Sequence, residues 1–174
     1  VTGLASAGTQ GLTFNRKSTV GLVGSMGEIR LGRDYSPQFY PDAQYDPFGT
    51  NGVASSLIAY GGGAAAVRAS NMIAYHSPNV GGVTVMLGSY MGENNTGAAA
   101  GKAGDGNGIH VRYAKGPLAL GIASSTTKTG LTTEVKTSTM GGSYNMGVAT
   151  LMVNSNTVSN TGAVDIKGML IGAH

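Results

Sequence analysis

The sequence predicts an all-β fold, an antiparallel transmembrane β-barrel, and three observations predict it. Apolar and polar residues alternate with period two along most of the chain, while helical periodicity is almost absent. Charged residues make up only 11% of the 174 residues, and glycine supplies 30 of them; an average soluble domain is about a quarter charged. Short turns alternate with long connections, which is typical of barrels with short periplasmic turns and long external loops.

Nine strands are expected, each from its alternation and from the turn residues at its ends. The expected strands are residues 13–24, 27–35, 69–77, 82–91, 107–115, 118–128, 134–146, 148–158 and 164–172. Short turns follow every second strand, and the long connections are residues 36–67 and 92–106. Single-chain bacterial barrels have an even number of strands. We therefore interpret residues 1–174 as one partial β-barrel domain, part of a longer chain.

The strands have two different faces. In residues 107–115, Ile109, Val111 and Tyr113 share one face, and His110 and Arg112 lie on the other. A barrel in lipid needs an apolar outside and tolerates a polar interior, because the closed ladder already satisfies the backbone. A soluble β-sandwich also alternates, so it remains an alternative. In residues 69–77 the same rule places Ile73 and Tyr75 on one face, and Ser70, Met72, Ala74 and His76 on the other.

Several classes of protein are excluded by composition. No stretch approaches 18 continuous apolar residues, so no transmembrane helix is expected. The chain has no cysteine, and its three histidines lack metal-ligand spacing. Its net charge is +3, and its basic residues form no continuous run. No acid–base pair or activated nucleophile stands out. We expect no catalytic residue, no metal, no cofactor and no nucleic-acid partner.

Three motifs carry a resemblance to a known family. They are FNRKSTVGL at 14–22, GEIRLGRDYSP at 27–37 and RASNMIAYHSP at 68–78. Together they resemble the general trimeric porins of Gram-negative outer membranes, in the betaproteobacterial, Neisseria-like branch. The specific motifs lie within the first 91 residues; from residue 92 the resemblance rests on strand rhythm. The chain departs from the family in lacking its first and last strands, and in ending at His174 instead of an aromatic residue.

The resemblance implies a 16-stranded barrel in the bacterial outer membrane. It implies a homotrimer of such barrels, with the third external loop of each folded into its lumen. The partners that follow are outer-membrane lipid and lipopolysaccharide, small hydrophilic solutes and inorganic anions.

The connection at 36–67 is the first candidate functional element. A loop this long is functional or disordered, and this one carries several aromatic residues that favour packing. The resemblance identifies it as the constriction loop. Its carboxylates, Asp42 and Asp46, either line the pore or only stabilise turns, since both lie in turn-forming contexts.

Arginines of the wall are the second candidate element. By resemblance Arg16 and Arg68 face the loop across the pore, although each could instead be a side chain that snorkels to the membrane interface. Arg30 shares a face with Glu28 and Asp34, so its parity permits a lumen position. Arginine on one wall and carboxylate on the loop would set a transverse field across a narrow opening.

Four further residues have weaker assignments. Arg33 faces the opposite way from Arg30, and the resemblance places the matching arginine at the trimer contact. Lys17 has the opposite parity to Arg16 and is expected at the membrane interface. His110 and Arg112 are lumen candidates if the alternation continues past Arg112.

The sequence therefore predicts a channel for passive diffusion of small hydrophilic solutes, with mild anion selectivity. The alternative is a structural or adhesive surface β-protein without channel activity. A substrate-specific channel is less favoured, because eight tyrosines and three phenylalanines leave little for a stacking track.

Overall fold

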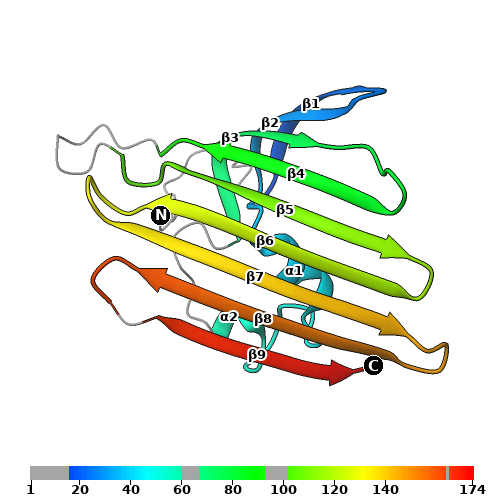
Figure 1. Cartoon of the computed structure of the whole chain (residues 1–174). Helices are drawn as coiled ribbons and strands as arrows, with labels where there is room; N and C mark the ends of the chain where they lie inside the picture. Colours follow the sequence, from blue (N-terminus) through cyan, green and yellow to red (C-terminus); the bar gives the residue numbers. More distant parts are fainter. Residues whose placement is uncertain (1–15, 60–66, 93–101, 164) are drawn as a thin grey trace, which may run out of the picture.

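A single antiparallel sheet dominates the computed structural model, which describes residues 16–59, 67–92, 102–163 and 165–174. Its nine strands are hydrogen-bonded in sequence order, β1 to β9 (Figure 1). The elements are β1 (Ser18–Gly24), β2 (Gly27–Tyr35), α1 (Phe39–Tyr45), α2 (Ser56–Ala59), β3 (Arg68–His76), β4 (Val83–Tyr90), β5 (Gly106–Lys115), β6 (Leu118–Lys128), β7 (Glu134–Asn145), β8 (Thr150–Asn160) and β9 (Ile166–Ala173).

The expected strands are confirmed, and most of their ends agree within two residues. β1 is the exception, because it begins at Ser18 and not at residue 13; residues 13–15 lie outside the described part. The turns lie where the sequence predicts them, because glycine occupies the positions at which the backbone adopts a positive φ. Gly27 ends the β1–β2 turn at a φ of 118°, a conformation that glycine adopts without steric cost.

The two faces of the sheet differ in chemistry. The face covered by α1, which we call the inner face, buries polar side chains of the wall strands. The opposite, outer face exposes large apolar side chains in cross-strand rows, as in the pairs Leu31↔Ile73 and Ile122↔Met140. This is the reverse of a soluble protein, where the exposed face is the polar one. The buried polar residues of the inner wall are Asp34, His110, Ser125, Thr127, Thr139, Asn154 and Asn156.

The described part of the connection between β2 and β3, residues 36–59, lies on the inner face. It contains two short helices, α1 of 7 residues and α2 of 4, which the sequence pattern does not predict. α1 contacts β6, β7 and β8, strands more than 70 residues further along the chain. In the described part of the chain, no helix has both the length and the apolar character needed to cross a membrane.

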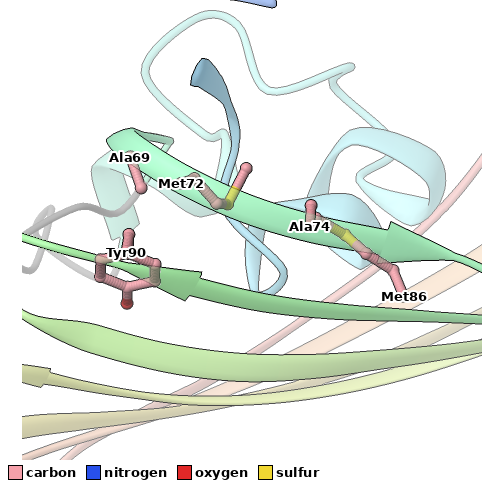
Figure 2. Close-up of a cluster of buried hydrophobic side chains, with 5 residues drawn as sticks. All are labelled: Ala69, Met72, Ala74, Met86 and Tyr90. Carbon is pink, nitrogen blue, oxygen red and sulfur yellow. The ribbon is translucent and has the colours of Figure 1, made fainter. Parts of the chain in front are cut away.

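One apolar cluster forms where β3 and β4 meet the loop. Figure 2 shows Met72 and Ala74 of β3 beside Met86 and Tyr90 of β4, all buried, with Ala69 at the start of β3. Tyr40 of α1 packs against this cluster. The Tyr90 hydroxyl makes a 2.6 Å hydrogen bond with Thr127 Oγ1, so even this cluster ends in a polar contact. Burial of these side chains holds the N-terminal end of the loop on the wall.

A β-bulge changes the parity of β3. The ladder with β2 pairs Gly32 with Met72 but Asp34 with Ala69, so Ser70 and Asn71 together oppose one residue. Asn71 has a φ of 51°, in the left-handed region where asparagine is tolerated. Ala69 is therefore buried and Ser70 is exposed. The prediction that Ser70 shares the face of Met72 is wrong, because strict alternation does not survive the extra residue.

Candidate functional site

Asp42 attaches α1 to the inner wall. Its Oδ1 accepts hydrogen bonds from Asn156 Nδ2 at 2.9 Å and from Asn154 Nδ2 at 3.1 Å. Both asparagines are on β8, and Asn154 Nδ2 also donates to the Pro41 carbonyl at 3.3 Å. Burial raises the pKa of Asp42 above its ordinary value, an effect only partly opposed by the hydrogen bonds from Asn156 and Asn154. The carboxyl group is thus a structural acceptor.

Asp46 closes the turn that joins the two helices. Its Oδ1 accepts a 2.7 Å hydrogen bond from the Phe48 amide. Its Oδ2 accepts from both the amide and the hydroxyl of Ser56, each at 2.8 Å. Asp42 and Asp46 are 7% and 4% exposed. These contacts favour the turn-stabilising interpretation of the two carboxylates, and a pore-lining role for them stays a prediction.

Glycines of the wall make room for the loop. The ring of Tyr45 crosses β6 and β7 at Gly121 and Gly141, where an added Cβ would lie 2.7 Å from Tyr45 atoms in each case. Tyr45 is only 1% exposed as a result. Nearer the start of the loop, Ser125 donates a 2.5 Å hydrogen bond to Gln38 Oε1. Packing and hydrogen bonds together fix α1 at three places on the wall.

A compact ionic cluster occupies the inner face of β2. The Arg30 guanidinium binds the Glu28 carboxylate through two nitrogens, with Nε–Oε1 and Nη2–Oε2 distances of 2.9 and 2.8 Å. Its Nη1 donates to Asp34 Oδ2 at 2.5 Å. The alternation of β2 brings all three side chains to one face, as their parity permits. Asp34 is 1% exposed, so this network is shielded from solvent on one side.

Lys17 belongs to the same cluster, and its expected place at the membrane interface is wrong. The Lys17 ammonium lies 3.2 Å from Asp34 Oδ2. Val20 and Leu22 of β1 are exposed on the outer face, so it is the odd-numbered residues of this segment that turn inward. With two cations and two carboxylates, the cluster of Lys17, Glu28, Arg30 and Asp34 is balanced in charge.

Arg16 and Arg68 are not brought into this cluster. Arg16 is exposed and precedes β1 by two residues, where it has the parity of the outward-facing Val20 and Leu22. Arg68 begins β3, and its guanidinium carbon lies 5.0 Å from the centre of the Tyr35 ring, a cation–π contact. The Tyr35 ring also packs against Phe39 at 4.8 Å, so Arg68 stands beside the root of the loop. Their roles in the pore stay predictions.

Arg33 faces away from Arg30, as its parity predicts. Its Nη1 donates a 2.7 Å hydrogen bond to Ser70 Oγ in an exposed position. Ser70 is available there because the bulge of β3 turns it outward. An arginine on the outer face of a membrane-embedded strand needs a polar partner, and Ser70 supplies one.

His110 and Arg112 lie on the inner face, so the alternation does continue through β5. His110 is 5% exposed, and its ring stacks on Tyr40 of α1 with a centroid distance of 5.3 Å and an interplanar angle of 15°. His76 of β3 meets the edge of the same tyrosine at 6.3 Å. The sequence pattern did not reveal this use of Tyr40, nor the pair of hydrogen-bond donors Asn154 and Asn156, because each contact joins distant segments of the chain.

No metal centre is built by the residues that the structure describes. They contain no group of three or more His, Asp or Glu side chains that could hold an ion. The arrangement instead is that of a transmembrane channel protein: a sheet with an apolar outer face, a polar inner face, and a loop that packs on the polar side.

Comparison with known proteins gives the family. A model of the Gram-negative porin family matches residues 3–174. Outer membrane porin protein 32 of Delftia acidovorans is 40% identical over 150 residues, which are 81% of this chain and 43% of that protein. The solved anion-selective porin from Comamonas acidovorans superposes with a TM-score of 0.79 at 33% identity, over 92% of this chain and 52% of that one. OmpF of Salmonella typhi has a TM-score of 0.67 at 18% identity, over 82% of this chain and 46% of its own.

The chain belongs to the Gram-negative porin family. Its location is therefore the bacterial outer membrane, and members of the family are channel proteins and not enzymes. The comparisons support the channel interpretation and not the adhesive alternative. The chain spans about half the length of the relatives that it matches.

Proposed function

We propose that the whole protein forms a water-filled channel for passive diffusion of small hydrophilic solutes, with a mild preference for anions. The observation that carries the proposal is the sidedness of the sheet. An exposed apolar face suits contact with hydrocarbon, and a polar face with a docked loop suits contact with water in a restricted lumen. Residues 36–67 act as the constriction loop, and their hydrogen bonds to β8 keep the loop on the wall.

The anion preference is supported by the balance of charges near the loop. Asp42 and Asp46 are buried and already hydrogen-bonded, so they present little free negative charge to a solute. The cations Arg68 and Arg112 have no carboxylate within ion-pair distance in the described part of the chain. An excess of arginine in a narrow, low-dielectric opening lowers the energy of a passing anion.

The individual residues take the following roles in this proposal. Arg16 and Arg68 provide free positive charge on the wall. Arg30 acts within a neutralised cluster, so it shapes the transverse field more than the net charge. Asp42 and Asp46 set the position of the loop, which defines the width of the opening.

The assembly is a homotrimer in outer-membrane lipid and lipopolysaccharide. Arg33, half-buried on the outer face of β2, is the proposed contact to a neighbouring subunit. The solved anion-selective porin from Comamonas acidovorans supports both the selectivity and the fold of this proposal through its 33% identity.

The test is reconstitution of the purified full-length protein in planar lipid bilayers. Conductance steps in groups of three and a reversal potential displaced toward the anion potential are expected in a salt gradient. Replacing Arg16 and Arg68 together with glutamine should move the reversal potential toward zero. Lys136→Gln is the matched control, because Lys136 is 63% exposed on the outer face and paired with Glu134. An absence of conductance steps would refute the channel, and an unchanged reversal potential in the arginine variant would refute the roles given to Arg16 and Arg68.

A further inference from the structure

A cavity of about 270 Å³ lies between α1 and the wall strands β3 to β5. The strand register explains its lining, because His76, Met86 and His110 form one cross-strand row and Thr84 pairs with Arg112 in the next row of the same face. Tyr40 and Gln44 of α1 cover it from the other side. Gln44, His76, Thr84 and Arg112 are only half-buried, so solvent reaches the cavity.

This cavity gathers buried polar atoms that have no hydrogen-bond partner. In the described part of the chain six such side-chain atoms exist, and four of them line the cavity. A fifth, the Tyr45 hydroxyl, adjoins it: this oxygen and His110 Nε2 each come to 3.4 Å of the position that a Cβ on Gly121 would take. The four lining atoms are Gln44 Oε1, His76 Nε2, His110 Nε2 and Arg112 Nε.

Orphaned polar atoms of this kind are costly, at about 1–3 kcal/mol each. Native proteins pair nearly all such atoms with protein groups, ordered water or a ligand, so four at one place mark a polar site that something other than the protein fills. The cavity is also positively charged, because Arg112 has no carboxylate within ion-pair distance among the described residues, and the other lining groups are neutral side chains or histidines. His110 is 5% exposed, which fixes its ring and makes it a preorganised donor.

We propose that this cavity binds hydrogenphosphate, a small oxyanion that carries a proton. The Nε–H of Arg112 and the Nε2–H groups of His110 and His76 donate to its oxygens, and the phosphate hydroxyl donates to Gln44 Oε1. Gln44 decides the chemistry of the ligand, because its oxygen can only accept. A fully deprotonated anion such as sulfate has no proton for it and leaves it unpaired.

The phosphate site adds a specific ligand to the proposed channel function. It rests on that function only because the anion would reach the cavity through the channel. The cavity shares no lining residue with the ionic cluster of β2, although Arg30, Glu28 and Asp34 of that cluster act electrostatically on its lining residues His76 and Tyr40. Hydrogenphosphate held at the wall would slow the passage of phosphate relative to chloride. Equilibrium binding, unlike conduction, is measured without a bilayer.

The test is calorimetric titration of the detergent-solubilised full-length protein with sodium phosphate at neutral pH, with sodium sulfate as the comparison. Phosphate should bind at least about tenfold more tightly than sulfate. Arg112→Gln should weaken phosphate binding by about tenfold or more, because a charge-assisted hydrogen bond is lost. Gln44→Leu should abolish the difference between phosphate and sulfate.

Lys115→Gln is the matched control, since it removes one positive charge from the exposed end of the same strand. Arg112→Lys keeps the charge and serves if the glutamine variant does not fold; it should still weaken binding because it lacks the Nε–H. Three results would each overturn the assignment. They are equal binding of sulfate and phosphate, unchanged phosphate binding in both Arg112 variants, and a phosphate-soaked crystal that shows only water in the cavity. Failure of this test leaves the bilayer result for the channel unaffected.

Discussion

The hydrogen bonds of Asp42 hold α1 on the inner wall, so Asp42→Ala is expected to loosen the loop while the barrel remains folded. Asn154 and Asn156 are 0% and 3% exposed, and each Nδ2 donates one hydrogen bond to Asp42. After the substitution each amide keeps a second acceptor: the Pro41 carbonyl for Asn154 and Asn154 Oδ1 for Asn156. The loss is therefore one hydrogen bond for each asparagine.

The magnitude follows from these two bonds. A hydrogen bond to a charged group contributes about 1.5–3 kcal/mol. The substitution also removes the cost of burying the Asp42 charge, which the raised pKa of Asp42 indicates, and this gain offsets part of the loss from the two hydrogen bonds. We expect a net cost to loop docking of about 2–3 kcal/mol, which corresponds to a change of roughly 30- to 150-fold in the docking equilibrium. Asp42→Asn keeps an acceptor oxygen and removes the buried charge, so it should differ from the parent by less than about 1 kcal/mol.

Hydrogen exchange measured by mass spectrometry on the full-length protein in detergent is the assay. The Asp46 amide, which donates to the Asp42 carbonyl at 3.1 Å, reports the opening of α1. Peptides from β6 to β8 serve as the internal reference, and the exposed Asp165→Ala is the matched control. If Asp42→Ala exchanges no faster than Asp42→Asn and Asp165→Ala, the loop is held by the packing of Tyr45, and the reasoning from hydrogen bonds fails.

Three further predictions concern the loop and its wall. Docking raises the pKa of Asp42, so the stabilisation of the docked loop by this group is fully present below the ordinary pKa of 3.8 and is lost as pH rises through the raised pKa. Hydrogen exchange of α1 should therefore quicken over that pH window. The Asp42→Asn variant should show no such pH dependence. Gly141→Leu should displace Tyr45, since the added Cβ alone would lie 2.7 Å from it, at a cost of about 1–3 kcal/mol to docking in the same assay; an unchanged Tyr45 environment would contradict the glycine argument. Asn71→Val should lower thermal stability in detergent by about 1–2 kcal/mol because of its φ of 51°, while Asn71→Gly should not; equal effects would show that the bulge does not need the left-handed conformation.

The strands could be predicted because their signal is local. Alternation in residues 118–128 and the glycine and proline turns at their ends require only neighbouring residues, and β6 has these same bounds. The inner positions of His110 and Arg112 followed from the same rule. The helices inside residues 36–67 carried no comparable signal, because a helix of one or two turns is stabilised by the surface on which it packs.

The parity of two segments could not be predicted. One extra residue at Ser70–Asn71 moves Ser70 to the outer face, and nothing in the local sequence requires a bulge there. Lys17 was assigned outward by its parity relative to Arg16, whereas its ammonium pairs with Asp34 across the β1–β2 ladder. In both cases the error is one residue, which is sufficient to exchange the two faces of a strand.

The sequence by itself determined the fold class, the positions of the strands and the two-faced chemistry of the wall, since these depend on periodicity and on turn residues. The motifs at 14–22, 27–37 and 68–78 pointed to the porin family, and the comparisons confirmed it. Only the tertiary structure decided which charges remain free. Asp42 meets Asn156, a residue 114 positions away, whereas Arg112 meets no carboxylate in the part of the chain that the structure describes. Separation along the chain does not predict either result, because the loop packs on strands that follow it much later in the sequence. The net charge of a pore wall depends on such pairings, and these form only when the loop is docked.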